Sequence, residues 1–284
     1  MLRQRILTAV ALLLVLLPAL FHPDTLYWRL ATLVLIVAAA WEWGRLNGWG
    51  HLAALSGAFG CLVACVMAWD LGWLGRPSAL LWTLAGGGWV LAGTALLRAG
   101  VARWASWPRG LRLAAGWLAL GLTWLAVVQA REVGVAFLLS VLVLVWGADI
   151  AAYFAGRAWG GRYSRSRLAP AISPGKSWEG VWGGMVAVVA LALIWLLLEA
   201  RGVLPPPSLY GHLWAHGGAV LLVVGVVALA AMSVVGDLVE SLVKRSAGMK
   251  DSSRLLPGHG GVLDRVDALL PTLPLAMMLY SLLQ

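Results

Sequence analysis

The sequence predicts an all-α, polytopic integral membrane protein with about nine transmembrane helices. Hydrophobic residues make up 61% of its 284 residues and charged residues only 12%, whereas soluble domains are about one quarter charged. The mean hydropathy is +0.86. Runs such as ILTAVALLLVLLPALF and VAFLLSVLVLVWG approach the length that crosses a hydrocarbon core. We expect these runs to be helical, because lipid offers backbone N–H and C=O groups no other partner.

Charged or Pro/Gly-rich breaks separate the apolar stretches. They place helices near 5–21, 26–46, 51–69, 77–97, 111–130, 133–155, 179–200, 216–244 and 264–283. We expect two regions, with about five N-terminal transmembrane helices in 1–130 and a catalytic transmembrane region in 131–284.

The first segment, MLRQRILTAVALLLVLLPAL, has the basic start and apolar stretch of a secretory signal peptide. However, no small-x-small cleavage site follows, and another apolar run begins at once. We therefore expect an uncleaved first helix. Cys61 and Cys65 lie four residues apart in an apolar run without further ligands nearby, so we expect them to serve packing.

The distribution of basic residues predicts the topology. With the N-terminus in the cytoplasm, all but four of the 21 Lys and Arg residues fall on the cytoplasmic side; the exceptions are Arg29, Arg76, Arg131 and Arg201. This bias places the C-terminus outside and the polar loops 156–178 and 245–263 in the cytoplasm. In a membrane protein a net charge of +9 reflects topology and anionic head groups, so we expect no nucleic-acid partner.

Polar residues gather on one helix face near the end of the chain. Asp237 is followed by Glu240, Ser241, Lys244 and Arg245, a spacing that aligns all five. Carboxylates at membrane depth are costly and normally mark function or pairing. The alternative interpretation is a helix that leaves the membrane, with an ordinary ion pair between Glu240 and Lys244.

Asp264 and Asp267 are three residues apart at the start of the last predicted helix. Carboxylates at a helix N-terminus interact favourably with the helix dipole, so a helix-capping role is one interpretation. With Asp237 from a neighbouring helix they also make an oxygen-rich site for Mg²⁺, which typically binds one or two carboxylates plus substrate phosphates. The surrounding basic residues fit that site if a polyphosphate brings its own negative charge.

Three further polar segments accompany this cluster. In LPGHGG, His259 lies in a tight turn, where it either contacts phosphate or is merely solvated. In SPGKSWEG, Lys176 lies just before a helix, in a segment whose backbone donors suit an anion but which lacks the P-loop spacing. Asp149 and Tyr153 share a helix face, although Asp149 alone is also a reasonable structural partner for Arg157.

The stretch SLVKRSAGMKDSSRLLPGHGGVLDRVD closely resembles the signature of the phosphatidate cytidylyltransferases, also called CDP-diglyceride synthases. The signature reads Ser-x-apolar-Lys-Arg, Lys-Asp-x-small, Pro-x-His-Gly-Gly and Asp-Arg-x-Asp. Its fixed positions are filled by Ser241, Lys244, Arg245, Lys250, Asp251, Ser253, Pro257, His259, Gly260, Gly261, Asp264, Arg265 and Asp267. The motif resemblance covers about the C-terminal half, and the first five helices match only in general character.

The resemblance implies transfer of CMP from CTP to phosphatidic acid, giving CDP-diacylglycerol and pyrophosphate at a bacterial-type inner membrane. It implies Mg²⁺ on Asp237, Asp264 and Asp267, with these three and Lys244 as catalytic residues. It implies substrate contacts from Lys176, Ser241, Arg245, Lys250, Asp251, His259, Arg265, Asp149 and Tyr153. Membrane lipid surrounds such a protein, and its glycine-rich helices suit a homodimer.

Two other functions remain open from the sequence. A transporter for an anionic solute explains basic loops and intramembrane acids, but it does not explain three carboxylates grouped with lysines around a glycine-rich turn. A CTP-dependent lipid kinase of similar architecture would release CDP in place of pyrophosphate. The CDP-alcohol phosphatidyltransferases are disfavoured because their paired-aspartate motif is absent.

Overall fold

The computed structural model describes residues 2–75, 77–164 and 166–284, so the predicted topology of Arg76 and Arg165 lies outside the described residues. Its long helices are α1 (Leu2–Phe21), α2 (Leu26–Leu46), α3 (His51–Asp70), α6 (Arg109–Val133), α7 (Val135–Trp159), α8 (Trp178–Ala200) and α9 (Leu209–Ser246). The shorter elements are η1 (Trp73–Gly75), α4 (Ala79–Gly88), η2 (Trp89–Gly93), α5 (Thr94–Ser106), α10 (Leu263–Val266) and α11 (Leu269–Leu282).

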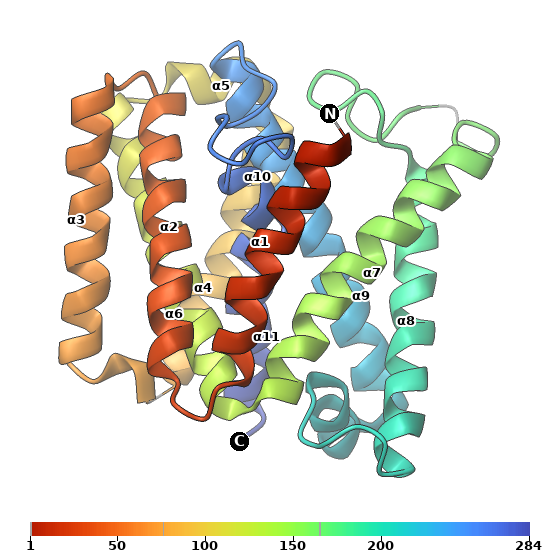
Figure 1. Ribbon diagram of the computed structural model, residues 1–284. Coiled ribbons are helices and arrows are strands. Elements are labelled where there is room, and N and C mark those ends of the chain that lie inside the picture. Colours follow the sequence, from red (N-terminus) through yellow and green to blue (C-terminus); the bar gives the residue numbers. More distant parts are fainter. Residues whose placement is uncertain (1, 76, 165) are drawn as a thin grey trace.

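The predicted fold class is confirmed. The described part of the chain contains helices and two isolated β-bridges but no strand. Eight of its helical segments are long and apolar enough to cross a membrane, and α11 adds a ninth, shorter helix of 14 residues. The helices run up and down in one bundle, with the two chain ends at opposite ends of it (Figure 1).

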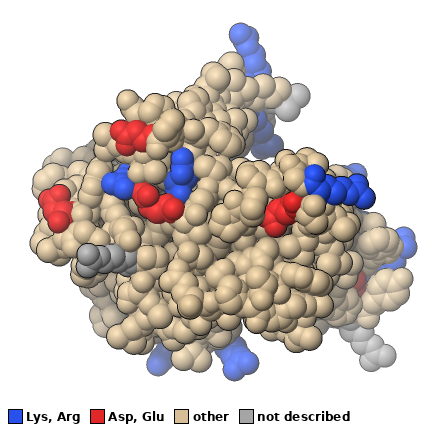
Figure 2. Space-filling view, turned by 90° about the horizontal axis from the view of Figure 1, so that it is seen from below, with Lys and Arg blue, Asp and Glu red and all other residues tan. Residues whose placement is uncertain are grey.

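The loops after α7 and α9 lie at the same end of the bundle as the N-terminus (Figure 1). Each is folded back on itself by a β-bridge, Ala169 to Ser173 in the first and Leu256 to Gly260 in the second. The opposite end, seen in Figure 2, carries only scattered charged side chains on a mostly uncharged surface. The polar loops 156–178 and 245–263 are therefore neighbours on one face of the bundle.

Two helices extend well beyond their predicted boundaries. The helix predicted to begin at 216 begins at Leu209, and Gly217 and Gly218 interrupt it with non-helical backbone. The helix predicted over 77–97 extends as far as Ser106, through the π-helical turn η2 and a break at Gly100. In both cases glycine allows the chain to bend without ending the apolar segment.

The last predicted helix, 264–283, is divided into α10 and α11. Pro271 has no N–H to donate to the carbonyl of Asp267, four residues earlier. That carbonyl instead accepts a 3.3 Å hydrogen bond from the N–H of Leu270. The division leaves Asp264 and Asp267 on a short segment ahead of α11.

Small residues bring α7 and α8 into close contact. A Cβ added to Gly180 or Gly184 would lie 2.8 Å from the carbonyl oxygen of Ala152 or 3.0 Å from that of Ala148. This close packing fixes Asp149 on α7 relative to the loop that precedes α8.

Candidate active site

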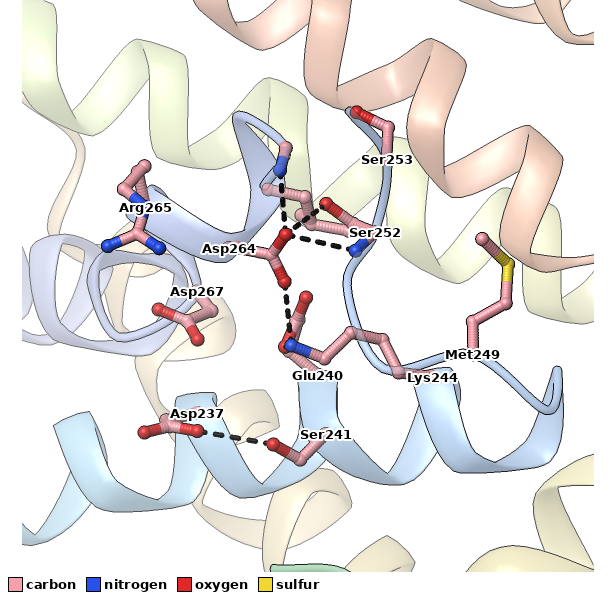
Figure 3. Close-up of polar contacts among 12 residues, drawn as sticks. Asp237, Glu240, Ser241, Lys244, Met249, Ser252, Ser253, Asp264, Arg265 and Asp267 are labelled. Carbon is pink, nitrogen blue, oxygen red and sulfur yellow. Dashed lines mark hydrogen bonds and ion pairs between the residues drawn. The ribbon is translucent and has the colours of Figure 1, made fainter. Parts of the chain in front are cut away.

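Lys244 joins the two helix segments that carry the acidic residues. Its ammonium lies 2.5 Å from a carboxylate oxygen of Glu240, one turn earlier on α9, and 2.7 Å from Oδ1 of Asp264 on α10 (Figure 3). The side chains of Glu240 and Asp264 are 2% and 7% exposed. The predicted Glu240–Lys244 ion pair is confirmed, but it belongs to a buried network that reaches α10.

Asp264 is held by donors on both of its oxygens. Oδ2 accepts hydrogen bonds from the backbone N–H and the hydroxyl of Ser252, at 2.9 and 2.8 Å, and from the N–H of Gly261 at 2.8 Å. Burial by itself would raise the pKa of Asp264, but Lys244 and these N–H groups outweigh it and hold the pKa at about 2. Asp264 is therefore ionised and fixes the loop before α10.

A second ion pair joins the other loop to α9. Lys176 bonds to Oδ2 of Asp237, and the hydroxyl of Ser241 donates to Oδ1 of the same carboxylate at 3.3 Å. Asp149 on α7 lies within electrostatic range of both Asp237 and Lys176. Four of the predicted site residues from three separate segments thus meet here.

Asp267 lies where α9 touches the start of the last helix. Its backbone carbonyl packs so closely on Gly236 that a Cβ there would be 2.4 Å away. Its side chain is directed toward α9 (Figure 3). Burial, together with the negative charge of the nearby Asp237, raises the pKa of Asp267. Asp237 and Asp267 therefore repel each other when both are ionised.

The three carboxylates predicted to bind metal are not gathered into one ligand set. Among the described residues, no group of three or more His, Cys, Asp or Glu side chains has an arrangement that would hold a metal ion. Asp264 has its oxygens occupied by Lys244, Ser252 and Gly261. Asp237 likewise accepts from Lys176 and Ser241, and Oδ1 of Asp267 accepts from the backbone N–H of Ala268 at 2.7 Å.

Glu42 contributes to the site but was not among the residues predicted from the sequence. It lies on α2 and is fully buried. Its carboxylate accepts hydrogen bonds from the backbone N–H groups of Val262 and Leu263, at 3.0 and 2.7 Å, and from the hydroxyls of Ser252 and Ser253. The signature loop is thus anchored to the N-terminal half of the chain. The available signal was an isolated carboxylate inside the apolar run IVAAAWEWG.

Arg245, in the last turn of α9, bridges the two loops. Arg245 donates from Nε to the carbonyl of Ile172 at 3.3 Å and from Nη1 to that of Met249 at 3.2 Å. The loop that contains Ile172 is itself organised by the buried carboxylate of Glu179, which accepts from the N–H groups of Tyr163 and Ser164. Arg245 therefore has a structural role that the sequence did not indicate.

The remaining predicted residues lie around this centre. Arg265 donates to the carbonyl of His259 at 2.7 Å and so braces the glycine-rich turn. Lys250 and Asp251 are exposed on the loop. Tyr153 is also exposed, and its hydroxyl accepts from Arg157 at 3.1 Å. Arg157 thus pairs with Tyr153, and the structure places Asp149 with Lys176 and Asp237.

Comparison with known proteins agrees with this arrangement. The model of the "Cytidylyltransferase family" matches residues 3–283, which include both loops and all the helices around them. The chain belongs to the cytidylyltransferase family. The matched region includes the first five helices, which the signature does not cover, and so it includes Glu42.

Several relatives in this family carry the same name. A phosphatidate cytidylyltransferase of Pseudomonas aeruginosa is 39% identical over 290 residues, covering 99% of this chain and 98% of the relative. The phosphatidate cytidylyltransferase of Haemophilus influenzae is 45% identical over 147 residues, 52% of this chain and 46% of the relative. That of Brucella suis is 42% identical over 196 residues, 68% of this chain and 63% of the relative.

Proposed function

We propose that this cytidylyltransferase uses CTP and phosphatidic acid and releases CDP-diacylglycerol and pyrophosphate. The observation that carries the proposal is the paired arrangement of Lys176 with Asp237 and Lys244 with Asp264 at one end of a membrane bundle. Two ammonium groups on adjacent segments suit a substrate that carries several phosphates. The names of the family relatives support the same reaction.

The chemistry requires positioning more than proton transfer. A phosphate oxygen of phosphatidate attacks the α-phosphorus of CTP, a new P–O bond forms, and the bond to the β-phosphate oxygen breaks as pyrophosphate leaves. Because the attacking phosphate is already anionic, no strong general base is needed. Lys176 and Lys244 would align the two substrates and offset the charge that develops on the equatorial and leaving oxygens.

We also propose that the reaction depends on Mg²⁺. Asp237 and Asp267 would hold the ion together with phosphate oxygens of CTP, since two carboxylates suffice when the substrate supplies further ligands. Mg²⁺, when bound, stabilises negative charge on phosphoryl oxygens and on the leaving pyrophosphate. Asp264 would join these ligands if Lys244 released its Oδ1 and bonded to a substrate phosphate.

The loops would place this chemistry at the cytoplasmic face of an inner membrane. The loop 156–178 lies at the same end of the bundle as the N-terminus (Figure 1), and its Arg residues would assign that end to the cytoplasm by the positive-inside rule. CTP would approach from that side, and the lipid from within the bilayer. Lys250, Asp251, His259 and Arg265 would line the entrance, and the homodimer expected from the glycine-rich helices stays a prediction.

A product assay tests this proposal. Purified protein in detergent is given CTP labelled at the α-phosphate and phosphatidate, with Mg²⁺ removed by chelation and then restored. We expect labelled CDP-diacylglycerol and stoichiometric pyrophosphate, both dependent on Mg²⁺. Release of CDP would identify a lipid kinase. Absence of product together with solute uptake by proteoliposomes would identify a transporter.

A further inference from the structure

An apolar cavity of about 460 Å³ adjoins the candidate active site. Its wall comes mainly from α4, η2, α5, α6 and α9, with single residues from α2, α10 and α11 and Trp107 between α5 and α6. Three residues connect it to the site: Gly236 precedes Asp237, Leu263 precedes Asp264, and Glu240 pairs with Lys244. The cavity is therefore continuous with the backbone that carries the proposed catalytic groups.

The side chains that line this cavity are almost all apolar, with one ionisable residue among them. Of the described residues in its wall, Glu240 alone has an ionisable side chain, and one of its carboxyl oxygens lies 2.5 Å from the Lys244 ammonium. The rest of the wall is aliphatic or aromatic, including Leu84, Leu122 and Trp89. Such a space suits a long apolar tail and does not suit a nucleotide, and an anionic head on the same ligand would lie beyond Glu240, near the Lys244 ammonium.

The sequence makes room for a tail along this wall. Gly88 ends α4, and Ala92 and Gly93 lie in the π-helical turn η2 that follows. All three are small residues that line the cavity. From Leu81 to Leu96 the lining extends for about 22 Å at the helical rise per residue, enough for a long chain to lie along it. π-Turns within α-helices are often associated with functional sites.

We infer that this cavity holds one acyl chain of the phosphatidate substrate while the phosphate is held near Lys244. The inference rests on the proposed function and adds the place where the lipid tail lies. The cavity would then favour long-chain phosphatidate over short-chain forms, because each additional methylene removed from water or from loosely packed lipid adds apolar contact.

Two neighbouring glycines provide a matched test. Gly88 lines the cavity and Gly87 does not, and among the described atoms none lies within 4 Å of a Cβ added to either. Gly88→Phe would fill the cavity, whereas Gly87→Phe would place the same side chain outside it. The value of kcat/KM is measured for dioleoyl and dihexanoyl phosphatidate in the same mixed micelles.

We expect Gly88→Phe to lower kcat/KM for the dioleoyl substrate by about tenfold or more while leaving the dihexanoyl substrate at the wild-type value. Gly87→Phe should resemble the wild type with both. If Gly88→Phe leaves the ratio of kcat/KM for the dioleoyl substrate to kcat/KM for the dihexanoyl substrate unchanged, the acyl-chain site is overturned but the proposed function stands. If the wild-type protein makes no CDP-diacylglycerol from either substrate, the proposed function fails and this inference fails with it.

Photo-crosslinking gives a second measurement that needs no variant. Wild-type protein is irradiated with phosphatidate that carries a diazirine near the methyl end of one acyl chain, and labelled peptides are identified by mass spectrometry. We expect labels in Leu81–Leu96 that exceed those from phosphatidylcholine with the same chain. Equal labelling by both lipids would mean that bulk membrane lipid fills the cavity, and would overturn the inference.

Discussion

Glu42 on α2 accepts a 2.7 Å hydrogen bond from the backbone N–H of Leu263, which lies 221 residues later in the chain. The same carboxylate holds Val262 and the hydroxyls of Ser252 and Ser253. A buried anion with four donors from one loop determines the shape of that loop, because each unpaired donor would carry a desolvation cost. The position of Asp264 therefore depends on a helix in the other half of the protein.

Glu42→Gln tests this dependence. The amide replaces one acceptor oxygen with an NH₂ group that faces one backbone N–H and one hydroxyl, so the hydrogen bond from that backbone N–H is lost. We expect turnover to fall by about tenfold or more and the free energy of unfolding to fall by about 1–3 kcal/mol. CDP-diacylglycerol formation and the detergent Tm measure the two effects. Glu132→Gln is the control, since Glu132 pairs with Arg29 away from the loop. Wild-type turnover in Glu42→Gln would remove this carboxylate from the loop's support.

Lys244→Met should be the most destabilising substitution in the network. It leaves the buried carboxylates of Glu240 and Asp264 without their common cation, a change that typically costs about 3–5 kcal/mol. Adding Glu240→Gln removes one of the unpaired charges, so the double variant should recover part of the lost Tm. Lys250→Met, at an exposed position on the loop, should keep the wild-type Tm. A Lys244→Met protein as stable as the wild type would contradict the buried ion-pair network.

Asp264→Asn should reduce both stability and activity. The wild-type Oδ2 accepts three hydrogen bonds, and Oδ1 accepts from Lys244. Whichever oxygen becomes NH₂ then faces a donor, and we expect the free energy of unfolding to fall by about 1–3 kcal/mol. Pyrophosphate release should be abolished because Lys244 loses its fixed position. The control is Asp70→Asn, at an exposed position on α3. An active and equally stable Asp264→Asn variant would show that this charge is dispensable.

Gly116→Ala tests the packing of the N-terminal helices. A Cβ on Gly116 would lie 1.9 Å from the indole ring of Trp43, one residue beyond Glu42 on α2. Because the indole is buried and donates to the carbonyl of Arg112, it cannot move aside without losing that bond. We expect a fall in stability of about 1–3 kcal/mol from overpacking.

Gly121→Ala on the same helix is the matched control. Among the described atoms, none lies within 4 Å of its added Cβ, so the higher helix propensity of alanine should maintain or raise the Tm. If the Gly116→Ala and Gly121→Ala variants had the same Tm, the close approach of α6 to Trp43 would not constrain the fold.

Much of the architecture was predictable because lipid permits so few backbone solutions. Apolar runs located α1, α2, α3 and α8 to within a few residues of their observed ends. The bend at Gly217 and Gly218 could not be predicted, because a glycine pair is compatible with either a continuous or a broken helix. Asp237, Ser241, Lys244 and Asp264 were found from helical spacing and the signature.

The contribution of Glu42 was not predictable from local sequence, since its partners are more than 200 residues away. From Asp237, Asp264 and Asp267 we predicted that α9 lies beside the start of the last helix, and the Lys244–Asp264 ion pair confirms that contact. Their spacing did not reveal that Lys176 and Lys244 bond to two of those carboxylates. Which donor reaches a carboxylate depends on the loop conformation, and that is determined by contacts between distant segments.

The hydroxyl of Thr8 on α1 donates a 2.8 Å hydrogen bond to the carbonyl of Pro257, 249 residues later. The ribosome releases α1 first, yet its partner turn is synthesised only when the chain is almost finished. The contact between α1 and the turn at Pro257 therefore forms only after almost the whole chain has entered the bilayer.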